Sequence, residues 1–385
     1  MWQPLSVEQL CRRVRDYCAF NSYTFNVEGV ARAAGMAAGE LRELGGEVEV
    51  FSVEAAEVVG RDGTIERAPI GPGVRAVFNG GSARRVLLSI HLDTVYPVEH
   101  WFREVSREGE RLHGPGVADA KGGLVVLLEG LGRYLACGGK TGVEVVLNPD
   151  EEIGSPSSRG VLVESAGRCV GGLVFEPTYP DGAMVSRRKG SGTYTVVVRG
   201  LSAHAGRDFE KGRNALVAAA EVAVGLAGLN GTMGGATVNC GVMEAGSAAN
   251  VVPDRAVLRV NVRVETGGEV AELDAAIRAV AAGVARREGI AVEVHGGVAS
   301  MPRPGDGVCG ELLAKVLDVA GSLGLPTASR PSGGTCDGNK LAAAGLAVAD
   351  SMGPTGGELH SPREYLDIAS LESRAELLCR VLGRL

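Results

Sequence analysis

The clearest chemical pattern in the chain lies between Val86 and Pro97, VLLSIHLDTVYP. A continuous run of Val, Leu and Ile is typical of a strand buried on both faces, as in a parallel sheet covered by helices. The run ends in His91, and Asp93 follows two residues later. Ligands bind beyond the carboxyl ends of such strands, so His91 could hold a metal while Asp93 orients its ring. The alternative is a polar residue that only ends the strand.

Further candidate ligands follow other predicted strands. Glu151 and Glu152 come after GVEVVL, Glu176 follows GLVF, and His360 lies in the loop after LAVADSM. Asp119 lies in the glycine-rich turn GPGVADAKGG, before a predicted helix. If these strands are neighbours in one sheet, the side chains converge at one edge.

This set of side chains suits divalent cations. Two histidines with oxygen ligands and no cysteine favour zinc, and cobalt or manganese would fit the same site. Five ligands exceed what one tetrahedral zinc takes, but they fit two metals that share a bridging carboxylate. Each residue also has a simpler interpretation: Asp119 as a helix cap, Glu151 and Glu152 as a solvated loop, and His360 as a surface histidine.

The order of predicted elements indicates the scaffold. Strands alternate with helices up to about residue 187, which predicts an α/β fold with a mostly parallel sheet flanked by helices. Between residues 188 and 300 the order becomes β-α-β-β-α-β, that of the ferredoxin-like α+β unit. We therefore expect one α/β domain, residues 1–187 and 301–385, interrupted by a compact insertion at 188–300.

Composition excludes several classes of function. The net charge is −7 with no basic block, so no nucleic-acid partner is expected. No apolar run is long enough for a membrane span, and the first twenty residues lack a signal peptide. The eight cysteines are dispersed without a Cys-x-x-Cys pair, which favours buried thiols in a reducing compartment. We expect a cytoplasmic protein.

Five motifs taken together resemble a known family. They are HLDTVYP, GPGVADAKGG, NPDEEIGS, FEPT and GELHSPREY. They are similar to those of the zinc-dependent exopeptidases and N-acyl amino acid deacylases, which include glutamate carboxypeptidase, acetylornithine deacetylase and succinyl-diaminopimelate desuccinylase. The resemblance covers essentially the whole chain in order, and it is closest to the glutamate carboxypeptidase branch. It implies a metallohydrolase that cleaves an amide bond and releases an amino acid with a free carboxylate.

The resemblance also implies how the ligands are shared between two zinc ions. His91 and Glu176 would hold one zinc, and Glu152 and His360 the other. Asp119 would bridge them.

Two further roles near the metals follow from the same resemblance. Glu151 would be the general base, and Asp93 would orient the ring of His91. The family often has an acidic residue directly after the bridging aspartate, where this chain has Ala120. Whether the Asp119–Ala120 peptide bond is cis, as is common in the family, stays open at this point.

The insertion would be the family's lid and dimerisation domain. His204, in GLSAHAG, matches the histidine that reaches the partner subunit's active site. Asn250 and Arg263 match the residues that grip the substrate carboxylate, a task that suits the planar fork of arginine. Gly333 and Gly334 resemble a substrate loop whose N–H groups can face an anion. A loop histidine and a surface arginine are the simpler interpretations of His204 and Arg263.

Three functions remain in competition. The first is a carboxypeptidase of the glutamate carboxypeptidase type, acting as a homodimer on a small peptide or N-acyl amino acid. The second is a biosynthetic N-acyl amino acid deacylase, of the acetylornithine deacetylase or succinyl-diaminopimelate desuccinylase type. The third, from another class, is a non-catalytic protein of the same fold that binds small peptides or has a regulatory role. Such a protein would typically have lost a ligand or the base, and here all of these positions are filled.

Overall fold

The apolar runs that predict buried strands form the central sheet of the computed structural model, which describes residues 3–82 and 84–385. Its six strands are Glu47–Phe51 (β1), Gly73–Phe78 (β4), Arg85–His91 (β5), Gly142–Asn148 (β8), Gly171–Val174 (β9) and Val348–Ala349 (β18). Their spatial order is β1-β4-β8-β5-β9-β18. β5 runs parallel to β8 and β9, and β9 runs parallel to β18. β4 is antiparallel to both of its neighbours.

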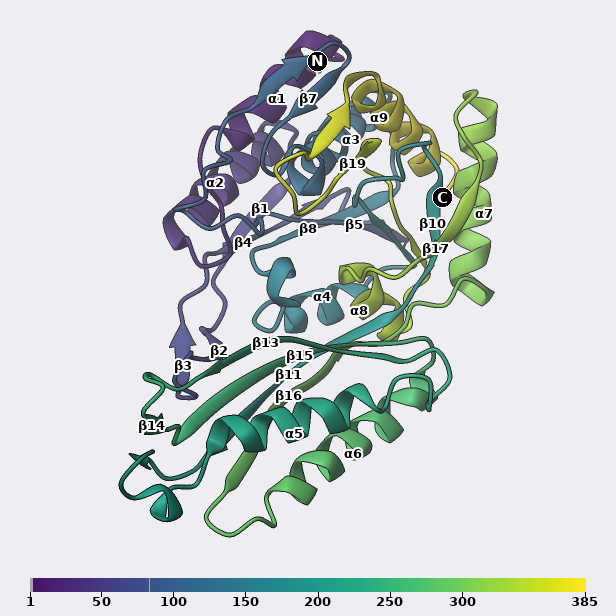
Figure 1. The fold of residues 1–385 in the computed structure, drawn as a ribbon. Helices are drawn as coiled ribbons and strands as arrows, with labels where there is room; N and C mark the ends of the chain where they lie inside the picture. Colours follow the sequence, from purple (N-terminus) through teal and green to yellow (C-terminus); the bar gives the residue numbers. More distant parts are fainter. Residues whose placement is uncertain (1–2, 83) are drawn as a thin grey trace.

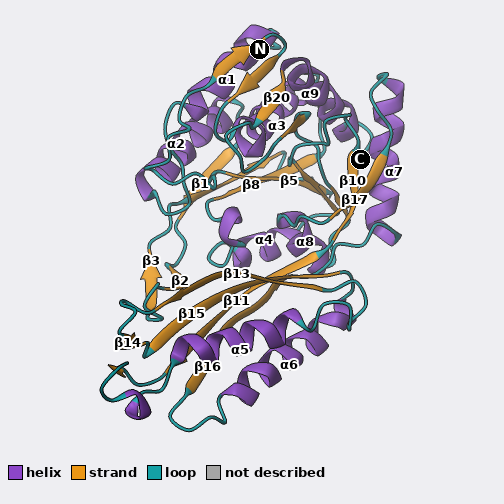
Figure 2. Cartoon of the chain, in the orientation of Figure 1, coloured by secondary structure: helices purple, strands orange, loops and turns teal. Residues whose placement is uncertain are grey.

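Helices cover both faces of this sheet (Figures 1 and 2). They are Val7–Cys18 (α1), Val27–Glu43 (α2), Gly123–Ala136 (α3), Arg159–Ala166 (α4), Gly307–Ser322 (α7), Asp337–Ala343 (α8) and Ile368–Leu382 (α9). Leu88 and Ile90 of β5 belong to the core formed with α1, α2, α3, α7 and α9. Leu87 belongs to the core on the other face, formed with α4 and α8. Successive residues of β5 thus serve both faces, as a buried strand requires.

The residues from Gly190 to Ser300 form a second body, which two connecting segments join to the main body. Its elements are Gly190–Arg199 (β11), Ala215–Ala227 (α5), Thr237–Ala245 (β13), Arg255–Val264 (β15), Gly267–Val284 (α6) and Ala291–Ser300 (β16). The sheet order is β13-β15-β11-β16, antiparallel throughout. α5 and α6 cover the face that points away from α4 and α8 (Figure 1). We call this part the inserted body.

These two bodies confirm the predicted fold class, a mostly parallel α/β sheet with an inserted β-α-β-β-α-β unit. The exact division into domains and the dimerisation role stay predictions. No helix in the described part of the chain is long and apolar enough to cross a membrane.

Several short strands were not expected from the sequence. They are Ala56–Val59 (β2), Ile65–Ala68 (β3), Ser106–Glu108 (β6), Arg111–His113 (β7), Met184–Arg188 (β10), Ala203–His204 (β12), Val251–Val252 (β14), Ser329–Ser332 (β17), Gly356–Gly357 (β19) and Tyr365–Asp367 (β20). β19, β20, β7 and β6 form a four-stranded sheet, and the others form pairs. Three short helical turns, Val117–Gly122 (η1), Glu151–Ile153 (η2) and Phe209–Lys211 (η3), complete the fold.

The two connections between the bodies lie side by side. Arg188 and Arg303 exchange backbone hydrogen bonds of 3.1 and 3.0 Å. The Asn339 side chain donates to the carbonyl of Lys189 (3.0 Å) and to that of Met301 (2.7 Å), so one residue of α8 holds both connections.

Candidate active site

Neighbouring parallel strands bring three of the candidate segments to one edge of the central sheet. His91 is the last residue of β5 and lies in register with Asn148, the last residue of β8. η2, which begins with Glu151, follows β8 after two residues, and Glu176 follows β9 after one. Because the strands point the same way, their carboxyl ends meet.

Asp119 and His360 reach the same edge from irregular backbone. Asp119 lies inside η1, where its φ of −115° and ψ of 89° interrupt the helical path. The Asp119–Ala120 peptide bond is cis, which answers the question that the sequence left open. His360 lies in the loop between β19 and β20 and has a positive φ of 57°. Such a conformation is uncommon for a residue with a side chain and often accompanies function.

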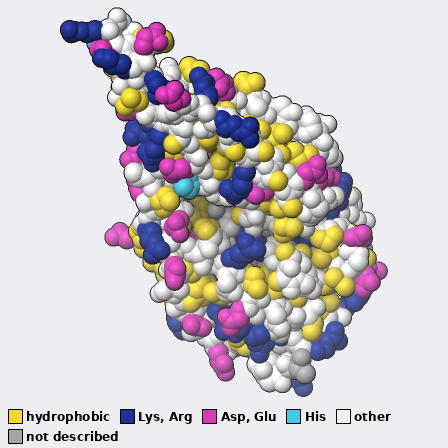
Figure 3. Space-filling model, turned by 90° about the horizontal axis from the view of Figure 1, so that it is seen from below, with side chains coloured by type: hydrophobic (Ala, Val, Ile, Leu, Met, Phe, Trp, Pro, Cys, Tyr) yellow, Lys and Arg dark blue, Asp and Glu magenta, His cyan; other side chains and the backbone are white. Residues whose placement is uncertain are grey.

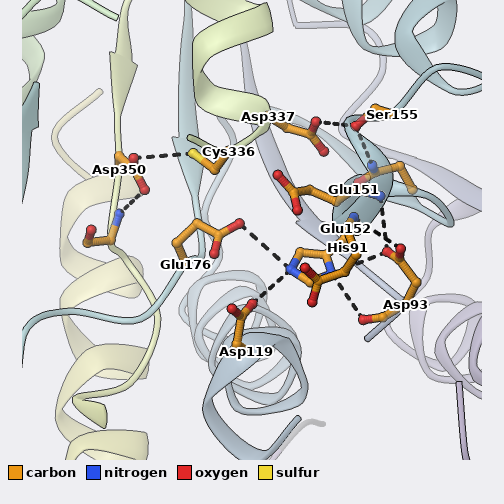
Figure 4. A network of polar contacts seen from close by, with 12 residues as sticks. His91, Asp93, Asp119, Glu151, Glu152, Ser155, Glu176, Cys336, Asp337 and Asp350 are labelled. Atoms are coloured by element: carbon orange, nitrogen blue, oxygen red, sulfur yellow. Dashed lines mark hydrogen bonds and ion pairs between the residues drawn. The ribbon is translucent and has the colours of Figure 1, made fainter. Parts of the chain in front are cut away.

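The five candidate ligands form one cluster, and Figure 4 labels four of them, His91, Asp119, Glu152 and Glu176. His91 Nε2 lies 3.0 Å from Asp119 Oδ1 and 3.8 Å from Glu176 Oε1. His360 Nε2 lies 3.2 Å from Asp119 Oδ2 and 3.4 Å from Glu152 Oε2. Asp119 therefore stands between two histidine–glutamate pairs, with one oxygen toward each. The structure brings together the residues that the sequence singled out, and their metal-binding roles stay predictions.

Asp93 lies behind this cluster and contacts three parts of it. Its Oδ1 is 3.3 Å from His91 Nδ1. Its two oxygens accept the backbone N–H groups of Glu151 and Glu152, each at 3.1 Å, and the hydroxyl of Thr24 at 2.6 Å. Asp93 can thus orient the ring of His91 and the turn that carries both glutamates.

The three carboxylates of the cluster are buried, and its two histidines do not neutralise all of their negative charge. Burial, with the nearby Asp119 charge, raises the pKa of Glu152 to about 7 and that of Glu176 to about 8. Hydrogen bonds with Asp119 and Glu152 raise the pKa of His360 to about 11. Glu152 Oε1 is buried and has no hydrogen-bond partner among the described residues. Crowded, buried carboxylates with an unpartnered oxygen are stabilised by cations, so this donor set fits divalent metals.

Glu151 stands next to the cluster without a side-chain hydrogen bond among the described residues. Its carboxylate extends into the space between Glu176 and Asp337 in Figure 4. Burial raises its pKa well above the usual range for glutamate. A carboxylate with increased proton affinity at the edge of such a cluster suits a general base.

Arg263 and the glycine loop meet where the two bodies join. Arg263 Nη1, from β15, lies 3.4 Å from Thr335 Oγ1, directly after Gly333 and Gly334. Gly333 also lines a cavity of about 710 Å³ at this junction, whose walls come from both connections and from the turn between β15 and α6. Burial lowers the pKa of Arg263, and no carboxylate pairs with it among the described residues.

His204 and Asn250 lie together elsewhere. His204 ends β12, Asn250 directly precedes β14, and the N–H of Ala205 donates to the Asn250 carbonyl at 2.9 Å. His204 Nδ1 accepts the N–H of Gly206 at 3.2 Å. Within the described chain, none of their contacts reaches the cluster, so a single chain does not complete this part of the predicted site.

One buried carboxylate near the cluster was not predicted from the sequence. Glu364, four residues after His360, accepts the backbone N–H of Asp119 at 3.0 Å. The available signal was an acidic residue immediately before a short apolar strand, within the motif that contains His360.

Comparison with known proteins gives the family. Residues 87–384 match the model of peptidase family M20/M25/M40, so the chain belongs to that family. It is 29% identical over 371 residues to carboxypeptidase G2 of Pseudomonas sp. (strain RS-16), covering 93% of this chain and 85% of that protein. It is 26% identical over 360 residues to a succinyl-diaminopimelate desuccinylase of Variovorax paradoxus (strain S110), covering 84% and 89%.

The fold agrees with solved structures of the family. An M20 family metallo-carboxypeptidase from Sulfolobus solfataricus superposes with a TM-score of 0.77 at 16% sequence identity, covering 98% of this chain and 100% of that one. A tripeptidase from Staphylococcus aureus superposes with a TM-score of 0.75 at 19% identity, covering both chains fully. The family membership makes this chain a metal-dependent hydrolytic enzyme.

Proposed function

We propose that this enzyme is a two-zinc carboxypeptidase that cleaves an amide bond and releases an amino acid with a free carboxylate. The observation that carries the proposal is the position of Asp119, with one oxygen near each of two histidine–glutamate pairs. The relative named carboxypeptidase G2, which matches along most of the chain, supports the choice of reaction.

The cluster supplies two complete sets of ligands. His91 and Glu176 would hold one metal, Glu152 and His360 the other, and Asp119 would bridge them. When bound, the metals supply a Lewis acid and lower the pKa of a water molecule. Zinc suits this donor set, and cobalt or manganese would fit it too.

Glu151 is the proton carrier of the reaction. It takes the proton of the attacking water and returns it to the departing amine. Asp93 holds the backbone that carries this carboxylate, because it accepts the N–H of Glu151 while its other oxygen accepts that of Glu152. Both glutamates therefore lie on one fixed turn. Glu152 would face the metals, and Glu151 would face the attacking water.

The substrate carboxylate would bind at the junction of the two bodies. Arg263 has free hydrogen-bonding capacity there and can form two parallel hydrogen bonds to a carboxylate. Gly333 lines the cavity in the same region, whereas the N–H of Gly334 donates to Ser332 Oγ at 3.1 Å.

His204 and Asn250 would act on the site of a second subunit in a homodimer. They lie side by side on the inserted body, so we propose that they reach the partner's site together, where His204 would stabilise the oxyanion. Figure 3 views the molecule from the side of the inserted body and shows hydrophobic side chains between charged ones. On α5, Leu216, Val217 and Val224 are exposed, which supports an interface on this body.

A deacylase of the desuccinylase type is the second candidate, supported by the relative of that name. The same metals and base would serve it, and only the acyl pocket would differ. We place either enzyme in the cytoplasm, with small peptides or N-acyl amino acids as substrates.

A substrate panel tests the proposal. Peptidyl and acyl derivatives of glutamate, ornithine and diaminopimelate are incubated with zinc-loaded or cobalt-loaded enzyme and with enzyme treated with a chelator. We expect release of glutamate, its loss on chelation, and its return with zinc. Preferred release of diaminopimelate or ornithine would favour the deacylase. Metal-loaded protein that hydrolyses no member of the panel would contradict both candidate reactions.

A further inference from the structure

Glu364 is a fully buried carboxylate that no catalytic role above uses. It lies between the loop of His360 and β20, and its side chain points back into the turn that carries Asp119. A buried carboxylate is costly unless several donors satisfy it. The groups that donate hydrogen bonds to Glu364 therefore indicate its role.

The backbone N–H groups of the turn around Asp119 need a hydrogen-bond acceptor. Gly116 has a left-handed φ of 76°, and the backbone at Asp119 is not helical, so the N–H groups here point inward. Glu364 Oε1 accepts those of Ala118 and Asp119, both at 3.0 Å, and Oε2 accepts that of Gly116 at 3.1 Å. Three N–H groups around one anion form a concave backbone nest, which binds negative charge well.

Glu364 also connects this turn to two other segments. The Tyr96 hydroxyl lies 2.7 Å from Glu364 Oε2 and 3.0 Å from the carbonyl of Ser361, the residue after His360. Tyr96 follows Asp93 by three residues. The backbone N–H of Gly114 donates to the Glu364 carbonyl at 3.3 Å. The segments that carry Asp93, Asp119 and His360 therefore all meet at this one side chain.

We propose that Glu364 is a positioning residue that holds the Asp119 turn and the His360 loop at the separation that two metals require. The inference rests on the proposed function, since it assumes that Asp119 and His360 are ligands. Glu364 acts through the backbone N–H of Asp119 and through Tyr96, and it contacts neither metal nor substrate. Hydrogen bonds to groups behind the ligands commonly contribute tenfold to a hundredfold to metal affinity.

A merely structural role is the alternative, and the chain offers a matched control. Glu144 is as buried as Glu364 and also accepts several hydrogen bonds, but from Arg75 and Arg85 of the central sheet and from Arg168 after α4. Its replacement should lower the stability of the fold without changing the metal site. Comparing Glu364→Gln with Glu144→Gln separates a loss of positioning from a loss of stability.

The experiment measures metal binding rather than turnover. Zinc affinity is obtained by competition with a coloured chelator, and the geometry of the site from the visible spectrum of cobalt-substituted protein. For Glu364→Gln we expect zinc affinity at least about tenfold weaker than in the wild type and a changed cobalt spectrum. For Tyr96→Phe, which removes one hydrogen bond from Glu364, we expect the same change to a smaller degree. Glu144→Gln should keep the wild-type affinity and spectrum.

Wild-type affinity and spectrum in Glu364→Gln would overturn the inference, even if its melting temperature fell. If that variant does not fold, Tyr96→Phe decides by the same two measurements, and wild-type values there would also overturn it. The proposed function can fail separately, because a wild type that binds two metals but hydrolyses no substrate refutes only the reaction. A wild type that binds no metal would overturn both.

Discussion

Glu151 and Glu152 are adjacent in the chain yet face different partners. Glu152 lies 3.4 Å from His360, whereas the Glu151 side chain makes no hydrogen bond among the described residues. Both depend on the same support, the carboxylate of Asp93, which accepts their two N–H groups. In the proposal, one aspartate thus orients a metal ligand and a base together.

The separation of these roles predicts the effect of Glu151→Gln. The amide keeps the size of the side chain but cannot carry the proton, so turnover should fall at least about a hundredfold. Metal content should stay at two per chain, because Glu151 is not a ligand in the proposal. Elemental analysis and kcat measure the two properties on one sample. Glu54→Gln, at an exposed position, is the control, and a Glu151→Gln enzyme with the control's kcat would exclude Glu151 as the base.

Residue types at strand ends, together with the five family motifs, predicted the cluster but not the residues that support it. His91 and Glu176 could be singled out because an apolar run stops at each of them. Glu364 and Glu144 were not singled out, because the groups that donate to them come from segments far away in the chain. Sequence patterns show that a carboxylate is present, and only the fold shows which N–H groups or guanidinium groups surround it.

At the scale of elements, β8 combines an apolar run with one charged side chain. Glu144 is fully buried in β8. It accepts hydrogen bonds from Arg75 of β4 (2.9 Å), Arg85 of β5 (3.1 Å) and Arg168 after α4 (2.8 Å). The carboxylate therefore ties three neighbouring strands, at a point that lies away from the carboxyl ends where the cluster forms.

This network predicts a pH-dependent stability. Burial alone would raise the pKa of Glu144, but hydrogen bonds from Arg168, Ser165 and the other arginines outweigh it and lower the pKa to about 2. Since the folded pKa is depressed, the stabilisation is present above the unfolded value of about 4.3 and is lost as pH falls toward 2. Hydrogen bonds to a charged group contribute about 2 kcal/mol, so Glu144→Gln should be less stable by about that amount at pH 7.

Urea unfolding of the wild type and of Glu144→Gln, both treated with a chelator, measures this pH-dependent stability between pH 7 and 2. The difference in free energy of unfolding between wild type and Glu144→Gln should shrink as the pH falls from about 5 to about 2. Glu54→Gln should show no such trend. A difference that stays constant across this range would mean that Glu144 is not held ionised by the arginines.

Local signals predicted the long helices well and the short strands poorly. The helix Val27–Glu43 has such signals, because its apolar spacing and the glycines that follow it are local features. The sheet of β19, β20, β7 and β6 was missed because Tyr365 pairs with His113, a partner far away in sequence. Strands of two or three residues are too short for an alternating pattern to show.

At the scale of the whole molecule, the site is divided between two bodies and, in the proposal, between two subunits. Backbone hydrogen bonds between the two connections, and the hydrogen bonds that the Asn339 side chain donates to both, hold the inserted body against the main body. Arg263 crosses from one body to the glycine loop of the other. His204 and Asn250 remain on the inserted body without a contact to their own cluster in the described chain.

Mixing two inactive variants tests whether sites are shared. Glu151→Gln lacks the proposed base, and His204→Ala lacks the group expected from the partner. In a heterodimer, one site combines an intact Glu151 with an intact His204, so activity should reappear that neither variant has alone. Purified heterodimers without any recovery, or a monomer in analytical ultracentrifugation, would contradict sharing.

The central claim is that two metals lie among the residues that converge at the edge of the central sheet. Anomalous diffraction from crystals of the zinc-loaded enzyme, recorded at the zinc absorption edge, tests it most directly. We predict two peaks per chain, one next to His91 and Glu176 and one next to Glu152 and His360. Asp119 should lie between them, with ligand distances of about 2.0–2.2 Å. No peak, or a single peak away from Asp119, would contradict the account.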